Sequence, residues 1–252
     1  MQQHMRKIFS SILFSFFFLA VFSVANAATR VWDGGGANAL ASTPGNWDGN
    51  VAPESGDDIL LDTTSSKDMT WDLDISVGNW TQDGYDGTVT ILTVYDPAGF
   101  TNLHISGNCI LNSGTWTHLA NPNTVTGINN EMYRLSVSVA GNMTIGAGVQ
   151  IDISGKGFVA GRGPDSVPSG NTGGGSHGGR GSTYGSNLAG PTYGSITRPT
   201  NLGSGGGGSA GGGALALYVM GELSLEGLIA ANGVERVYHA GAGGSVLLDI
   251  GS

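Results

Sequence analysis

Two short acidic stretches carry the residue types best suited to chemistry. Asp57 and Asp58 lie in a turn-rich segment with Asp62 close behind, and Asp83 and Asp86 flank a Gly-Tyr pair. Carboxylate oxygens in tight turns suit calcium, so Asp57, Asp58, Asp83 and Asp86 are candidate metal ligands. Neither stretch follows the EF-hand or the glycine-rich nonapeptide calcium pattern. Because aspartate is also a preferred turn residue, structural turn aspartates are the favoured interpretation, and no cofactor is expected.

Serine, histidine and cysteine offer weaker chemistry. The hydrolase motif G-x-S-x-G surrounds Ser176 and Ser209, but both copies lie in glycine tracts with no helix pattern behind them, so neither is expected to be a nucleophile. Cys109, the single cysteine, lies in an alternating apolar stretch and is expected to be a buried small hydrophobe. Four histidines lack metal-ligand spacing and are expected to be exposed or in turns. They are His104, His118, His177 and His239.

A basic and aromatic set lies in the glycine-rich stretch 155–213. Arginine and tyrosine are common contact residues, so this stretch is a candidate for contact with acidic glycans or lipid headgroups. A solvated loop is the alternative. The candidate contact residues are Arg162, Arg180, Tyr184, Tyr193 and Arg198.

Carbohydrate-active enzymes are the catalytic alternative. Glu222 and Glu226 are four residues apart on one strand face, about 13 Å at strand rise, which is too far for a catalytic carboxylate pair. A groove that gathers two carboxylates with an arginine or lysine would favour an enzyme. A sandwich-type carbohydrate-binding module would instead expose Trp71, Trp80 and Trp116 on one face, but we expect these side chains to be buried or edge-packed. The favoured function is therefore noncatalytic.

The N-terminus predicts export. Arg6 and Lys7 precede an apolar run over 8–24 and an A-N-A cleavage site at 25–27, so residues 1–27 are expected to be a signal peptide. A membrane anchor is the alternative, which the short run disfavours. Cleavage leaves 225 residues and, because Arg6 and Lys7 are lost, changes the formal charge from −9 to −11. An acidic exported chain is a poor candidate for nucleic acid binding. Membrane contact is expected only through the signal peptide or an anchor outside the sequence.

Alternating short segments predict an all-β protein. LSVSVAGNMTIGAGVQIDISGKG begins at Leu135, and LYVMGELSLEGLIAANG begins at Leu217. Apolar residues two apart place one face of each segment in a core. Superposing Gly141 on Gly221 pairs Val139 with Val219, Met143 with Leu223 and Ile145 with Leu225. The second copy then has two residues fewer, after which Ile151 pairs with Ile229 and Gly155 with Gly233. Such copies favour stacked rungs of a β-solenoid, with a β-sandwich as the alternative.

Five segments follow from these patterns. Trp32 and Trp47 lie among turn residues and are expected to cover one end of the core. The glycine-rich stretch has little to fill a core and is expected to form a long loop, partly ordered against the side of the solenoid. The segments are a signal peptide at 1–27, a Trp/Gly-rich cap at 28–62, rungs at 63–154, a loop insertion at 155–213 and further, truncated rungs at 214–252.

The chain resembles large bacterial surface proteins. W-D-G-G-G at 32–36, G-N-W-D at 45–48 and P-x-x-G-D-D at 53–58 are similar to the N-terminal segment of autotransporter passengers and filamentous-haemagglutinin-type adhesins, and GTVTI, LHISGNCILNSGTW and VSVAGNMTIG resemble their repeats. The resemblance covers most of 30–252. It implies a right-handed parallel β-helix at the cell surface or outer membrane. It implies an adhesin-like or structural role, with glycans or cell-surface components as partners.

Overall fold

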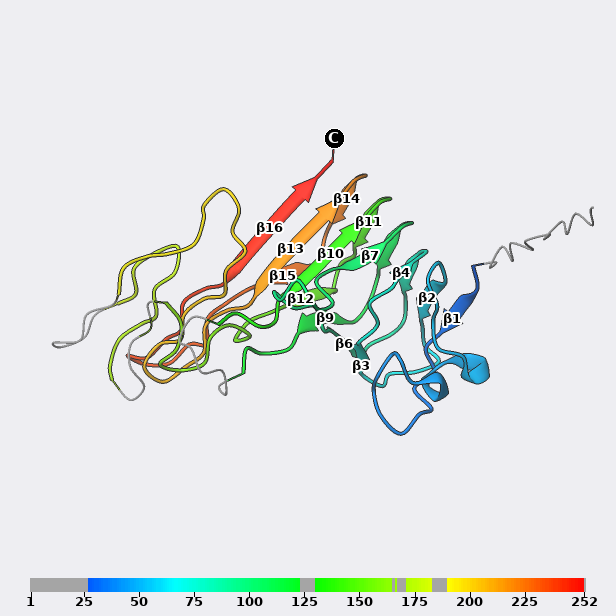
Figure 1. Ribbon diagram of the computed structural model, residues 1–252, viewed down its shortest axis with the longest axis horizontal. Helices are drawn as coiled ribbons and strands as arrows, with labels where there is room; N and C mark the ends of the chain where they lie inside the picture. The colour runs from blue at the N-terminus through cyan, green and yellow to red at the C-terminus, as the bar shows by residue number, and fades with distance from the viewer. Residues whose placement is uncertain (1–26, 123–129, 165, 167–170, 183–189, 252) are drawn as a thin grey trace, which may run out of the picture.

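Three parallel β-sheets make up the fold (Figure 1). The computed structural model describes residues 27–122, 130–164, 166, 171–182 and 190–251, so the predicted signal peptide lies almost wholly outside the described residues. Within the described part, every ladder between named strands is parallel. The prediction of an all-β protein is confirmed, and the antiparallel sheets of a β-sandwich do not occur among these ladders. No helix in the described ranges is long and apolar enough to cross a membrane.

The strands are short and are distributed evenly over the three sheets. The first sheet contains β1 (Thr29–Val31), β2 (Asp58–Leu61), β5 (Trp80–Gln82), β8 (Cys109–Leu111), β11 (Met143–Ile145) and β14 (Leu223–Leu225). The second sheet contains β4 (Ser76–Val77), β7 (Leu103–Ile105), β10 (Leu135–Val139), β13 (Ala214–Val219) and β16 (Ser245–Ile250). The third sheet contains β3 (Met69–Trp71), β6 (Thr88–Ile91), β9 (Thr115–His118), β12 (Gln150–Asp152) and β15 (Leu228–Ala230). Two 3-10 helices, η1 (Pro44–Asn46) and η2 (Asp48–Asn50), lie between β1 and β2.

The chain visits the sheets in a constant order. From β3 to β16 it passes through the third sheet, then the second, then the first, and each strand pairs with the strand three positions later. A single short strand cannot bury its apolar face alone, whereas stacked copies share one continuous core. Successive passes of the chain therefore depend on their neighbours for stability.

The register predicted from sequence is largely confirmed. Four of the five predicted pairs are ladder partners: Val139 with Val219, Met143 with Leu223, Ile145 with Leu225 and Ile151 with Ile229. In place of the fifth pair, the Gly155 N–H donates to the carbonyl of Asn232, next to Gly233. The alternating pattern and the corner glycine together were enough to set this register.

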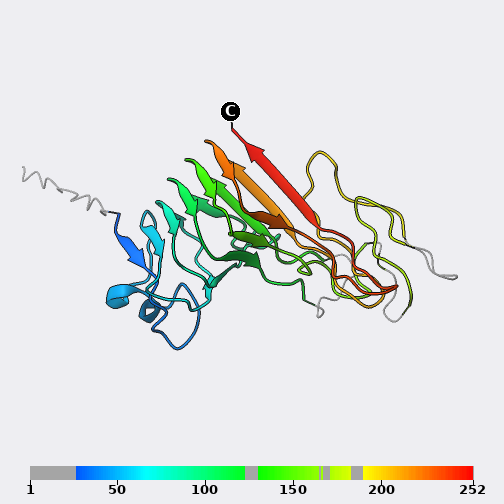
Figure 2. The same ribbon diagram turned by 180° about the vertical axis from the view of Figure 1, so that it is seen from behind.

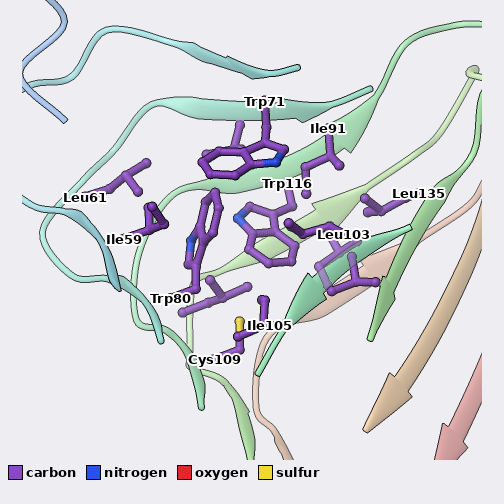
Figure 3. Close-up of a cluster of buried hydrophobic side chains, with 14 of the residues drawn as sticks. Ile59, Leu61, Trp71, Trp80, Ile91, Leu103, Ile105, Cys109, Trp116 and Leu135 are labelled. Atoms are coloured by element: carbon purple, nitrogen blue, oxygen red, sulfur yellow. The ribbon is translucent and has the colours of Figure 1, made fainter. Parts of the chain in front are cut away.

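The core lies between the three sheets and contains an unbroken row of tryptophans, of which Figure 3 shows Trp71, Trp80 and Trp116. All five are at most 1% exposed, and each contacts the next edge to face with ring centroids 5.0–6.5 Å apart. They are Trp32, Trp47, Trp71, Trp80 and Trp116. The first two precede β2 in the chain and pack at that end of the core. Cys109 is also buried, as predicted, and burial raises the pKa of its thiol.

A column of side-chain hydrogen bonds, which begins with Asp58 and continues through asparagines, links successive passes of the chain along the first sheet. We call it the amide column. The Oδ1 atom of Asp58 accepts the backbone N–H of Asn79 at 2.6 Å, and Asn79 accepts that of Asn108 at 2.9 Å. Asn108 then accepts the N–H of Asn142, and Asn142 that of Glu222, both at 2.9 Å. A glycine precedes each donor because a Cβ there would lie 2.2–2.4 Å from the accepting Oδ1. At the Gly-Asn corners seen in the sequence, the Asn side chain thus hydrogen-bonds to the backbone of the next pass of the chain.

Substituting Asn108 tests this column. Asn108→Ala removes the acceptor for the Asn142 N–H, so we expect the free energy of unfolding to fall by about 1 kcal/mol. Asn108→Asp keeps a side-chain oxygen, as Asp58 does at the start of the column, and is expected to recover most of that loss. Urea unfolding of both variants measures the difference, and an alanine variant as stable as the original chain would contradict a stabilising role.

The last strands of the first and second sheets, β14 and β16, leave inward-facing apolar residues exposed. Leu225 on β14 is 44% exposed, and Leu248 and Ile250 on β16 are 40% and 37% exposed. Their ladder partners Ile145, Leu217 and Val219 are at most 1% exposed. The inner face of the stack is therefore open at this end of the described chain, whereas tryptophans close the other.

Candidate functional site

The glycine-rich stretch forms a second region beside the sheets (Figures 1 and 2). Residues 202–207 are buried, and the backbone of this stretch hydrogen-bonds to segments far away in sequence. The Phe158 N–H donates to Gly203, the Gly211 N–H to Phe158 and the Gly212 N–H to Ala242, at 2.9–3.1 Å. Phe158 and Leu202 are buried with Ala214 in a small cluster of their own. The stretch predicted as a long loop therefore contains buried, hydrogen-bonded backbone.

Close backbone approach explains most of the glycines in 203–213. None of them has a positive φ, so an unusual backbone conformation is not the reason. A Cβ on Gly205 would lie 2.1 Å from the carbonyl oxygen of Val159, and one on Gly211 would lie 2.0 Å from that of Gly203. Backbone segments at this distance leave no room for a side chain, and their mutual hydrogen bonds replace a side-chain core.

This region contains a cavity of about 680 Å³, in the range typical of small-ligand sites. Its walls come from segments 175–180, 192–199 and 242–246, so it lies where the glycine-rich stretch meets the start of β16. The lining residues with side chains are Thr192, Ser195 and Ser245, the larger His177, Arg180 and Tyr193, and the apolar Ile196, Pro199, Ala242 and Val246. Among these described side chains Arg180 is the one with a fixed charge, and none is a carboxylate.

The imidazole of His177 is held in one orientation at this cavity. Its Nδ1 lies 2.9 Å from the carbonyl oxygen of Gly243, and because a carbonyl only accepts, Nδ1 carries the proton. The Tyr193 ring packs on the imidazole with centroids 4.7 Å apart. Burial lowers the pKa of His177, which the carbonyls of Gly243 and Gly244 oppose in part. The ring is therefore neutral near pH 7, with Nε2 as an acceptor.

The predicted contact residues divide between this cavity and the surrounding surface. Arg180 and Tyr193 both line it, although the Tyr193 hydroxyl points away and donates to the Leu202 carbonyl. Arg162 and Arg198 are exposed and do not line it. Tyr184 lies outside the described residues. Sequence reasoning missed His177, whose part in the cavity depends on Gly243, far along the chain.

The two serine motifs serve the packing of the glycine-rich region. The Ser176 hydroxyl is buried, donates to the Gly190 carbonyl at 3.0 Å and accepts the Gly181 N–H at 3.0 Å. The Ser209 hydroxyl donates to the His239 carbonyl. Both hydroxyl groups are thus engaged with backbone groups, and neither lies on the strand-to-helix turn that a hydrolase needs.

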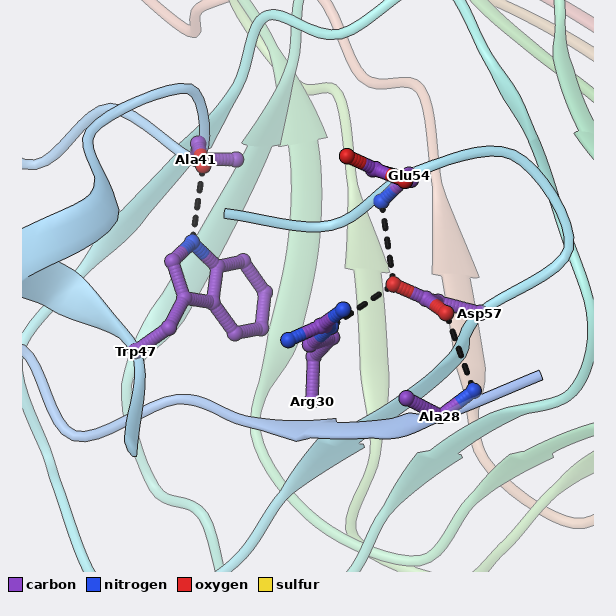
Figure 4. A network of polar contacts seen from close by, with 6 residues as sticks. All are labelled: Ala28, Arg30, Ala41, Trp47, Glu54 and Asp57. Atoms are coloured by element: carbon purple, nitrogen blue, oxygen red, sulfur yellow. Dashed lines mark hydrogen bonds and ion pairs between the residues drawn. The ribbon is translucent and has the colours of Figure 1, made fainter. Parts of the chain in front are cut away.

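The Asp57 carboxylate holds the segment around β1 in place (Figure 4). Its carboxylate accepts from the Ala28 N–H at 2.9 Å, from Arg30 Nε at 2.7 Å and from the Glu54 N–H at 3.0 Å. Burial alone would raise the pKa of Asp57, but these hydrogen bonds and the Arg30 charge hold it below its usual value. The Asp57 oxygens are therefore used by the protein itself.

The other three calcium candidates have different environments. Asp58 begins the amide column, and Asp83 and Asp86 are exposed on either side of the buried Tyr85. In the described ranges, no group of three or more histidine, cysteine, aspartate or glutamate side chains is placed to hold a metal ion.

His118 corrects the expectation of exposed or turn positions, and His177, although it lies in a bend, is buried. His177 is 8% exposed, and His118 is fully buried at the end of β9. His118 Nδ1 donates to the Leu119 carbonyl at 2.8 Å, and its Nε2 accepts the Ala214 N–H at 3.3 Å. His118 thus contacts the point where the chain leaves the glycine-rich stretch and enters β13. Trp116 and His118 share the inward face of β9, which is the signal that sequence reasoning overlooked.

The chain was compared with protein-family models, curated proteins and solved structures. No protein-family model, no curated protein and no solved structure matches the chain.

Proposed function

We propose that the chain is an exported, noncatalytic protein of the cell surface or outer membrane, adhesin-like or structural, built as a right-handed parallel β-helix. The observation that carries this proposal is the constant order in which the chain visits three parallel sheets around one core. Right-handed crossovers between parallel strands are the strong general preference. Such a stack presents a stiff lateral surface, and the glycine-rich region offers a preformed cavity beside it for contact with surface components.

The distribution of charged groups supports a noncatalytic role. Three cavities differ in their lining: the first contains Arg180 without a described carboxylate, the second contains Asp58, and the third contains Asp96 and Glu131. None of these three combines two carboxylates with a lining arginine or lysine among the described residues, which is the arrangement expected of an enzyme on this scaffold. The burial of Trp71, Trp80 and Trp116 likewise removes the aromatic platform that a carbohydrate-binding module would use.

Processing and accessibility in the producing cells test the proposal. Mass spectrometry of the mature product is expected to find Ala28 at the N-terminus, because the A-N-A site precedes it. Antibodies against the purified chain are expected to label intact cells as strongly as permeabilised ones. Product that keeps residues 1–27 and is labelled only after permeabilisation would refute export. A second assay for new reducing ends or unsaturated uronates, after incubation with acidic polysaccharides, is expected to detect none.

A further inference from the structure

We propose that the cavity lined by His177 and Arg180 binds a sugar acid, a uronate residue of an acidic glycan. This inference rests on the proposed function, because it names the ligand class of the same contact region. Three properties of the cavity lead to it: a neutral acceptor in a fixed orientation, a single cation, and apolar groups beside both.

The neutral acceptor selects a hydroxyl group. Since His177 Nδ1 donates to Gly243, Nε2 keeps its lone pair, and this atom lies beside Gly194, where an added Cβ would be 2.9 Å from it. The Tyr193 ring and the Gly243 carbonyl prevent the imidazole from turning. An acceptor of this kind pairs with a ligand O–H and cannot pair with a fully ionised phosphate or sulfate oxygen.

The cation selects a carboxylate next to that hydroxyl. The Arg180 guanidinium offers several N–H donors in a planar fork that fits a carboxylate. The protein carries a formal charge of −9, so an arginine in a cavity whose described lining has no carboxylate is a local exception to its overall charge. A ligand that places a carboxylate and hydroxyls on one small ring satisfies both groups together.

The apolar lining fits the carbon face of a sugar ring. Tyr193 lines the cavity with its ring, because its hydroxyl is held by Leu202 and Ser204. Ile196, which is 95% exposed, and Val246 lie at the same cavity. Aromatic and aliphatic surfaces pack against the C–H groups of a sugar, while the polar groups set its orientation.

Calorimetric titration of the purified chain with tetragalacturonate tests the inference. We expect saturable binding that weakens about tenfold in Arg180→Gln, because a charge-assisted hydrogen bond is lost. Arg162→Gln and Arg198→Gln remove the same charge from the same stretch outside the cavity, and they are expected to change the affinity less than about twofold. Arg180 is exposed, so its substitution leaves the fold intact; circular dichroism checks this.

Ligand variants identify the chemical class. The carboxyl-reduced tetrasaccharide, which lacks the charge, and tetraglutamate, which lacks sugar hydroxyls, are both expected to bind at least about tenfold more weakly. Equal losses in all three arginine variants would show diffuse electrostatic attraction and overturn the inference. Absence of tetragalacturonate binding, or binding only to vesicles of anionic phospholipid, would overturn it as well. The Ala28 N-terminus and surface labelling are measured separately, so the proposed function would survive that failure.

Discussion

Gly211→Ala is expected to destabilise the protein by about 3 kcal/mol or more, the largest effect that we predict for a single added methyl group. The Gly211 N–H donates to the Phe158 carbonyl at 2.9 Å, and its carbonyl accepts the Gly157 N–H at 2.8 Å. The new Cβ would lie 2.0 Å from the carbonyl oxygen of Gly203. The backbone segments cannot separate without losing hydrogen bonds on both sides, so the clash cannot be relieved by a side-chain rotation.

Gly178→Ala and Gly179→Ala are the matched controls. Both glycines lie in the same stretch, have no positive φ and have no atom within 4 Å of an added Cβ. The free energy of unfolding of each control variant is expected to stay within about 0.5 kcal/mol of that of the original chain. Urea unfolding followed by tryptophan fluorescence gives the three free energies. A Gly211→Ala variant as stable as the controls would show that the stretch is a loop and not a packed region.

The sheets could be predicted from sequence because their signal is local. Val139 and Met143 lie on either side of a corner glycine, and the same spacing recurs around Gly221, so one superposition fixed the strand pairing. The alternating apolar positions indicated which residues face the core. These patterns depend on neighbours within a few residues, and the stack repeats them at each pass.

The glycine-rich region could not be predicted in the same way. A glycine has no side chain whose spacing could indicate a buried face, and glycine-rich composition is also typical of flexible linkers. What orders this stretch is backbone pairing with residues far away, such as Gly212 with Ala242 and Gly205 with Arg162. The cavity could be predicted only in part for the same reason. Arg180 and Tyr193 were identified as contact residues from their types, but the orientation of His177 depends on Gly243, which is far away in sequence.

His118 connects the sheets to the glycine-rich region, because it lies on β9 and accepts the N–H of Ala214 at the start of β13. This contact is expected to weaken in acid. Burial and, to a smaller extent, nearby Lys156 lower the pKa of His118 to about 4, although the hydrogen bond to Leu119 acts in the opposite direction. Protonation would put a hydrogen on Nε2, which now accepts the Ala214 N–H, and two donors would then face each other. The folded state therefore prefers the neutral ring that an unfolded chain keeps only above about pH 6.5.

We therefore expect the free energy of unfolding to fall by on the order of 3 kcal/mol through His118 as the pH drops from about 6.5 to 4, because the unfolded chain binds this proton first. His118→Gln provides an amide that does not titrate, so the stability difference between the original chain and this variant should shrink across that window. His104→Gln, a change on the exposed face of β7, should keep the original pH dependence. Urea unfolding at half-unit pH steps measures all three proteins. If the difference between the original chain and His118→Gln is constant with pH, the buried neutral histidine does not control the attachment of the glycine-rich region to β13.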